Sequence, residues 1–89
     1  MSDTFKQKLI DYTQASNLEP EQKKLWELFT KISNPDEDEA VFEAISESDD
    51  NLKLLTTFLR DKIFDMKASN EKAWDKLMTE YGDYVKTLM

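Results

Sequence analysis

Residues 34–51, NPDEDEAVFEAISESDDN, carry eight acidic side chains and neither lysine nor arginine. Carboxylates in such a cluster could bind calcium, whose EF-hand loop needs oxygen ligands at alternate positions and a glycine at its sharp turn. In a loop that started at Asp36, however, Ala40 would take a ligand position and Val41 the glycine position. Alanine offers no side-chain oxygen and valine disfavours the turn, so we predict no metal site in this segment.

Paired carboxylates could also act as a general acid and a general base if a cleft raised the pKa of one of them. No spacing in the sequence singles out such a pair, because the acids fall where exposed helix ends and faces are expected. The chain also has no histidine, no cysteine, no glycine-rich phosphate loop and no GxSxG motif. We predict no catalytic residues, no cofactor and no enzymatic activity; the rival hypothesis is a hydrolase that buries two acids in a pocket.

The composition indicates a single helical domain, residues 1–89. One glycine and two prolines leave little material for the turns of a β-hairpin protein. Strong helix formers fill most of the sequence, 39% of the residues are hydrophobic, and the absence of cysteine excludes disulfides. We therefore predict an all-α fold, a compact bundle of four main helices preceded by a shorter N-terminal helix.

The net charge of −7 has a local origin. Outside residues 34–51 the chain has 11 acids and 12 bases, so the negative charge comes from the acidic stretch. That stretch would repel phosphates, which disfavours direct binding to nucleic acid or to an anionic membrane. No apolar run resembles a signal peptide or approaches the ~20 residues of a membrane span, so the expected compartment is the cytoplasm.

Five helical segments follow from apolar periodicity and capping residues. The first carries Phe5 and Leu9, and the others begin near Pro20, Asn34, Ser48 and Asn70. Because the apolar stripe of the last segment keeps its phase on both sides of Gly82, we expect that helix to continue through the glycine. The predicted core consists of Leu28, Phe29, Ile32, Val41, Ile45, Leu55, Leu59, Ile63, Trp74, Leu77 and Tyr81.

The first turn of the third helix accounts for three of the eight acids in this stretch. Asn34 and Pro35 suit its first positions, and residues 36–38 lie in the first turn, where the helix dipole stabilises acidic side chains. These three acids therefore need no functional explanation. The buried stripe of this helix is expected at Ala40, Val41, Ala44 and Ile45.

The outer side of the same helix holds the candidate binding surface. Glu39, Glu43 and Glu47 recur at every fourth residue and form one row of like charge. Phe42 lies between this row and the buried stripe, about 100° from each. An acidic row flanked by an exposed aromatic side chain would suit a basic protein partner. The alternative is a solvated face, with Phe42 folded against a neighbouring helix.

Apolar residues outside the main stripes give two further expectations. On the fourth helix, Leu54, Phe58 and Phe64 lie outside the stripe, which predicts a helix in the middle of the bundle. On the second helix, Trp26 lies off the stripe and is a candidate surface anchor or dimer contact, since tryptophan is enriched at interface centres. The alternative for Trp26 is a lid over one end of the bundle.

The functional hypothesis is a small non-catalytic protein that works by binding another protein. Its candidate surface residues are Trp26, Glu39, Phe42, Glu43 and Glu47. The alternative is an inhibitor that mimics nucleic acid and occupies a basic enzyme groove with the acidic face of residues 36–50. Strongly salt-dependent binding to a DNA- or RNA-binding enzyme would distinguish this alternative. The sequence leaves the oligomeric state open.

Overall fold

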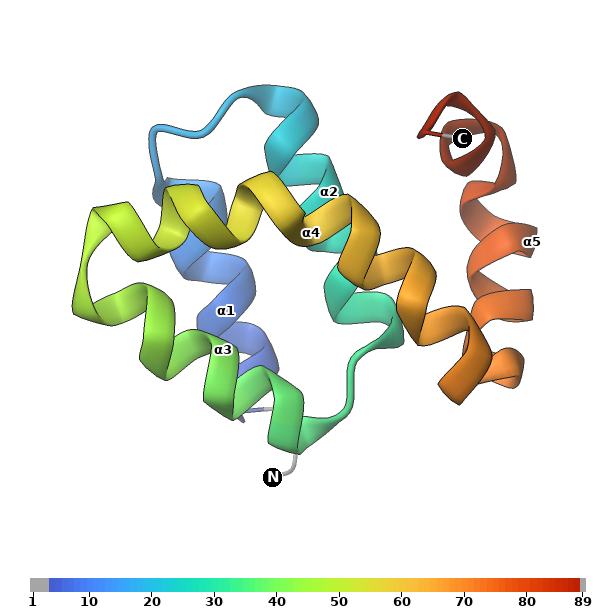
Figure 1. Cartoon of the computed structure of the whole chain (residues 1–89), viewed down its shortest axis with the longest axis horizontal. Helices are drawn as coiled ribbons and strands as arrows, with labels where there is room; N and C mark the ends of the chain where they lie inside the picture. Colours follow the sequence, from blue (N-terminus) through green and yellow to red (C-terminus); the bar gives the residue numbers. More distant parts are fainter. Residues whose placement is uncertain (1–3, 89) are drawn as a thin grey trace.

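The computed structural model describes residues 4–88, which contain five α-helices and no strand (Figure 1). In chain order these are α1 (Thr4–Ala15), α2 (Pro20–Ile32), α3 (Pro35–Glu47), α4 (Asp49–Ser69) and α5 (Glu71–Leu88). The shortest is α1, with 12 residues, and the longest is α4, with 21. The predicted all-α bundle with a short N-terminal helix is confirmed.

Local sequence explains where the helices begin. The Asn34 side chain accepts a hydrogen bond from the backbone N–H of Glu37 at 2.8 Å, and Ser48 and Asn70 cap α4 and α5 in the same way. Pro20 opens α2, a position at which its missing N–H is not needed. Single residues separate α3 from α4 and α4 from α5, so the chain reverses abruptly between these helices.

Four of the helices close into a ring. α1 packs against α2 and α3, α3 against α4, and α4 against α2, so each helix of this ring touches two others. α5 packs outside the ring, against α2 and α4, at the right of Figure 1. The radius of gyration of 12.4 Å is close to the roughly 12 Å expected for a compact chain of this length.

The core contains most of the residues predicted for it. Eight of the eleven are at most 5% exposed. The other three, Val41, Leu55 and Tyr81, are partly buried and pack against the core. The third helix corrects one expectation, because Ala40 is exposed and only Ile45 of its predicted stripe is fully buried.

α5 does not continue through its glycine as a regular helix, which corrects the prediction. Tyr81 has non-helical backbone angles (φ −128°, ψ 20°), so the helix is kinked just before Gly82. Beyond the kink, Val85 is 1% exposed and the Tyr84 hydroxyl donates to the Glu21 carbonyl at 3.2 Å. The kink therefore lies where the last turns of α5 are anchored on the first turn of α2.

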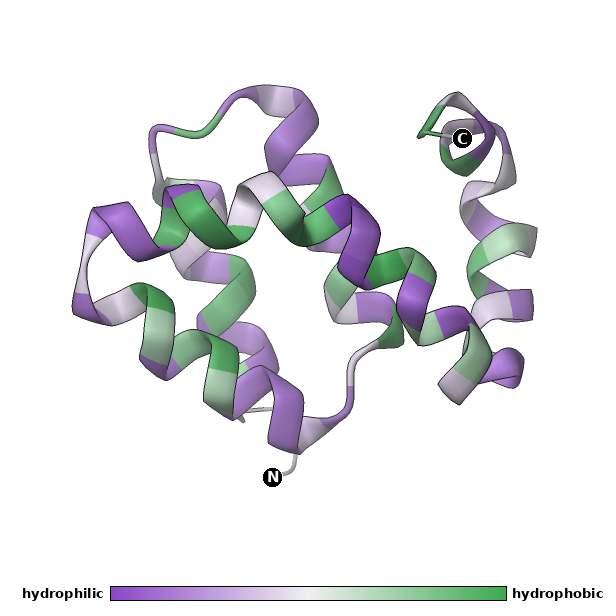
Figure 2. Cartoon of the chain, in the orientation of Figure 1, coloured by the Kyte–Doolittle hydropathy of each residue, from purple (hydrophilic) through white to green (hydrophobic). Residues whose placement is uncertain are grey.

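α4 has three neighbouring helices, as expected for a helix in the middle of the bundle. The neighbouring helices do not cover α4 on all sides, however, because Leu54 and Phe58 are exposed. Hydrophilic residues interrupt the apolar ones along every helix (Figure 2). Among residues 4–88 no helix has both the length and the apolar character required to cross a membrane.

Candidate functional site

The two ends of the acidic stretch have opposite surroundings. At the N-terminal end, Asp38 is only 1% exposed. Its Oδ2 lies 3.0 Å from Nζ of Lys6 on α1, and its Oδ1 accepts a hydrogen bond from Ser33 Oγ. The prediction of a solvated first-turn acid is therefore wrong for Asp38. The i, i+3, i+7 spacing of Asp38, Val41 and Ile45 was the available signal of its burial.

Lys6 holds this buried cluster together. Its Nζ also donates to the backbone carbonyls of Thr30 (2.6 Å) and Ser33 (3.2 Å) and lies 3.1 Å from Ser33 Oγ. These carbonyls belong to the C-terminal end of α2, where a positive charge is favourable. One side chain of α1 thus joins the end of α2 to the start of α3. Within residues 4–88 no buried side-chain nitrogen or oxygen lacks a partner, so the cluster is internally satisfied.

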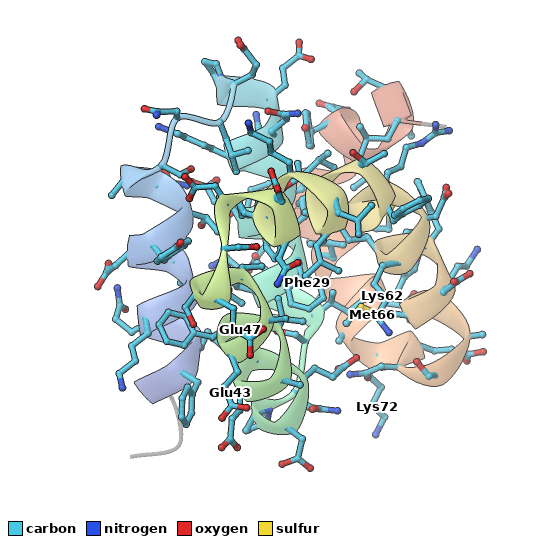
Figure 3. All side chains as sticks on the ribbon, turned by 60° about the vertical axis from the view of Figure 1, so that its left-hand side comes forward. Phe29, Glu43, Glu47, Lys62, Met66 and Lys72 are labelled. Atoms are coloured by element: carbon cyan, nitrogen blue, oxygen red, sulfur yellow. The ribbon has the colours of Figure 1, made fainter. Side chains whose placement is uncertain are left out.

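The glutamate row lies outside this cluster. Glu39, Glu43 and Glu47 are all exposed. The acids in ion pairs within residues 4–88 are Asp38 and Glu37, so no described lysine or arginine is paired with the row. Successive members differ by about 40° around the helix. The row therefore slants from the α1 side at Glu39 to the α4 side at Glu47, and Figure 3 shows Glu43 and Glu47 on the outside of α3.

Phe42 belongs to the packing between α1 and α3. It is partly buried, with its ring centroid 6.2 Å from that of Phe5 and 6.0 Å, edge-on, from that of Tyr12. Such pairs contribute about 0.5–1.5 kcal/mol beyond the area that they bury. The expectation of an exposed aromatic beside the acidic row is therefore wrong, and the alternative, a ring folded against a neighbouring helix, is correct.

Trp26 is not a surface anchor, which corrects the second candidate. It is 1% exposed, its Nε1 donates to Thr56 Oγ1 at 2.9 Å, and its ring meets Phe29 edge-on. Because α2 has three neighbouring helices, it buries three consecutive residues, 28–30, rather than a single stripe. The position of Trp26 off the stripe was thus no sign of exposure in this helix.

The exposed apolar residues are Leu54 and Phe58. Their exposed fractions are 57% and 56%, and no other large hydrophobic residue within the described range is exposed. They lie one turn apart on α4, outside the buried stripe that contains Leu59 and Ile63. Their position off the stripe predicted a helix in the middle of the bundle, but an apolar residue off a stripe does not by itself distinguish a buried helix from an unpartnered surface.

An open cleft of about 710 Å³ lies between the α1–α2 connection and the first turns of α4. Its wall combines apolar residues such as Leu18 and Leu52 with the charged residues Glu19, Asp49 and Lys53. Both of its acids are exposed. The cleft therefore lacks the pair of buried acids that the hydrolase hypothesis requires.

The surroundings of Tyr84 raise the pKa of its phenol. Burial raises the pKa of its phenol, and the carboxylates of Glu21 and Glu27 raise this pKa further. The Lys24 ammonium lies 4.5 Å from the ring centroid, and the hydroxyl donates to a backbone carbonyl of α2. These contacts fasten the end of α5 to α2 and leave the phenol protonated at neutral pH.

The remaining observations add no second candidate site. Within the part of the chain that the structure describes, no three acidic side chains converge in a way that could hold a metal ion. Neither a protein-family model, nor a curated protein, nor a solved structure matches this chain.

Proposed function

We propose that this chain is a non-catalytic protein-binding domain that contacts a basic protein through the row formed by Glu39, Glu43 and Glu47. The observation that supports this proposal is that all three carboxylates are exposed and unpaired within residues 4–88. Each like-charge pair at this spacing costs a helix about 0.2–0.5 kcal/mol. Lysine or arginine side chains of a partner would turn this repulsion into attraction and would speed the encounter.

The alternative, a nucleic-acid mimic, has less support. The row carries one charge per about 6 Å of helix axis, whereas one strand of DNA carries one phosphate charge per about 3.4 Å of duplex axis. Two acids of the stretch are also engaged within the protein, Asp38 by Lys6 and Glu37 by Lys62. The outer row thus has a lower charge density than the molecule that it would have to imitate.

Comparative capture tests the proposal. Tagged wild-type protein and the variant Glu39→Gln/Glu43→Gln/Glu47→Gln are used to capture proteins from an extract of the source cells. A matched control, Glu71→Gln/Asp75→Asn/Glu80→Gln, removes the same charge from exposed positions on α5. We expect a basic protein that wild type and control retain and the row variant loses.

The captured protein is then purified and titrated against all three forms. We expect the row variant to bind at least about tenfold more weakly and the control to stay within about twofold of wild type. Equal binding by the row variant would refute the proposal. Competition by single-stranded or duplex DNA for the captured protein would favour the mimic instead.

A further inference from the structure

Leu54 and Phe58 form an apolar surface on the flank of α4 that faces α3. Asn51 and Lys62, which lie on the same side of α4, both reach α3. Asn51 Nδ2 donates to the Ala44 carbonyl at 2.8 Å, and Lys62 Nζ lies 3.9 Å from Glu37. Phe58 lies between these two contacts along the helix, so it lines the junction of α3 with α4, and Leu54 lies one turn away on the outer side.

The residues of α3 at this junction are too small to cover the phenylalanine ring. Ala40 lies between Glu37 and Ala44 along α3, and it is itself exposed. Because α3 and α4 are antiparallel neighbours, this alanine lies at about the level of Phe58. A methyl group can cover little of a phenylalanine ring, and the Phe58 side chain is 56% exposed. The result is an apolar strip consisting of Ala40, Leu54 and Phe58.

Acidic side chains surround the apolar strip. Glu43 and Glu47 lie beside Ala40 on the exposed side of α3, and Asp50, Asp61 and Asp65 lie on the outer side of α4. The nearest base on this side is Lys62, which is already close to Glu37. The bases Lys53 and Arg60 lie toward the other flank of α4, and within residues 4–88 neither forms an ion pair with these acids.

We infer that this strip is the apolar centre of the binding surface, and that its partner presents an amphipathic helix whose leucine-like stripe is bordered by lysine or arginine. The inference rests on the proposed function and specifies its partner. Leu54 and Phe58 would insert into the partner's stripe, while Glu43 and Glu47 meet its basic border. Apolar anchors inside a charged rim are the usual arrangement of a protein interface.

Charge and secondary structure select this partner. A second copy of the chain would place the same acidic border against itself, because a twofold interface pairs each patch with its own equivalent. An extended peptide has no sheet edge to join within residues 4–88, where the backbone is almost entirely helical. Side chains spaced by one helical turn instead match a helix that lies across them.

A defined peptide tests the inference without the natural partner. The probe is a leucine–lysine peptide of about 15–20 residues whose leucines form one helical stripe. A shuffled peptide of the same composition, without the stripe, is the peptide control. Both are titrated by calorimetry against wild type, Leu54→Gln/Phe58→Gln, the glutamate-row variant, and the control Thr57→Gln/Ala68→Gln at exposed α4 positions outside the strip.

We expect wild type to prefer the striped peptide and Leu54→Gln/Phe58→Gln to bind it at least about tenfold more weakly, with the Thr57/Ala68 control unchanged. Circular dichroism should show all variants folded, because every substituted side chain is exposed. Equal binding by Leu54→Gln/Phe58→Gln, together with weaker binding by the row variant, would overturn the inference and leave the proposed function standing.

Three other outcomes would contradict either the proposed function or the inferred partner. Binding that survives loss of the glutamate row but not loss of the apolar pair would contradict the proposed function. Absence of any preference of wild type for the striped peptide would overturn the inference. So would concentration-dependent dimerisation in sedimentation experiments that Leu54→Gln/Phe58→Gln abolishes, because the occupant would then be a second copy.

Discussion

Two acidic side chains nine residues apart on α3, Asp38 and Glu47, have opposite environments. Asp38 is buried and bonded to Lys6 and Ser33, whereas Glu47 is exposed and has no described cation beside it. Both belong to one acidic run, and both lie on the same helix. What separates them is the helical face, because the face of Asp38 meets α1 and the end of α2 while the face of Glu47 meets solvent.

The comparison shows that the side chains facing a charge decide its role. A charge that faces a cation of the same chain stabilises the fold, whereas a charge that faces solvent remains available to a partner. At the buried end the charge is compensated and its hydrogen bonds are complete. At the exposed end, compensation has to come from water, salt or another molecule. Removing a charge should therefore destabilise the fold at the first end and leave it intact at the second.

The largest effect is expected for Lys6→Met. This substitution leaves the Asp38 carboxylate buried without its cation and removes the donor to two carbonyls at the end of α2. Loss of one partner of a buried ion pair typically costs about 3–5 kcal/mol. Urea denaturation should show a loss near this range, and the exposed Lys31→Met, near the same end of α2, should lose less than about 1 kcal/mol.

Substitution of the other partner, Asp38→Asn, is expected to lower the free energy of unfolding by less, about 2–3 kcal/mol. The Lys6 side chain that remains is 26% exposed and can reach water. The double variant Lys6→Met/Asp38→Asn should be more stable than the sum of the two single losses predicts. Additive losses would mean that the two side chains do not act as a pair. Asp38 would then not differ from Glu47 in having its charge compensated within the chain.

Local chemistry made the helix starts predictable. The Asn34 cap, the prolines and the short connections depend on residues within one turn of each other, and the structure contains them where expected. Most of the core was also predictable, because the periodicity of apolar residues within each helix depends on that helix alone. The kink at Tyr81 did not, because it accompanies contacts between α5 and the start of α2, about sixty residues away in the chain.

The candidate site was predictable only in part. Periodicity gave the exposed glutamate row but not the environment of the aromatic residues. Trp26 is buried and donates its N–H to Thr56, thirty residues later, and Phe42 packs against α1. Phe58 is 56% exposed although α4 has three neighbouring helices. Each outcome depends on which helix lies opposite, and a single stripe does not contain that information.

An effect smaller than that of the buried pair and larger than that of the exposed row is expected at the start of α3. The Asn34 side chain accepts the Glu37 N–H at 2.8 Å, and the Glu37 side chain accepts the Asn34 N–H at 3.1 Å. Asn34→Ala removes the first bond and should cost about 0.5–2 kcal/mol in urea denaturation. Asn34→Ser keeps an acceptor and should recover most of that loss. Equal losses for alanine and serine would show that the cap is not the stabilising feature.

A smaller effect is expected for Tyr84, which is partly buried, whereas Asp38 is buried and Glu47 exposed. Its pKa is raised in the folded chain by burial and by Glu21 and Glu27, so the unfolded chain loses this proton first as the pH rises. The stabilisation from the phenol is therefore complete below about pH 10 and declines above it. Tyr84→Phe should cost about 0.5–1 kcal/mol at neutral pH through loss of one hydrogen bond.

The difference between wild type and Tyr84→Phe should then shrink above about pH 10, because only the wild type has this phenol to ionise. Urea midpoints for both proteins at neutral and alkaline pH measure this difference while the other titrating groups affect both chains alike. A difference that stays constant with pH would mean that the phenol has the same pKa in the folded and unfolded chains.

The smallest effect is expected where Glu39, Glu43 and Glu47 are replaced by glutamine, which nearly preserves shape and helix propensity and so isolates charge. Because the three carboxylates are exposed and unpaired within residues 4–88, the variant should be no less stable than wild type. Relief of two like-charge neighbours should add several tenths of a kcal/mol at low salt, and this gain should shrink as salt screens the wild-type repulsion. Urea denaturation at low and high salt measures both effects. A loss greater than that of Asn34→Ala would show that these glutamates stabilise the fold as Asp38 does, and the charge of the row would no longer be free for a partner.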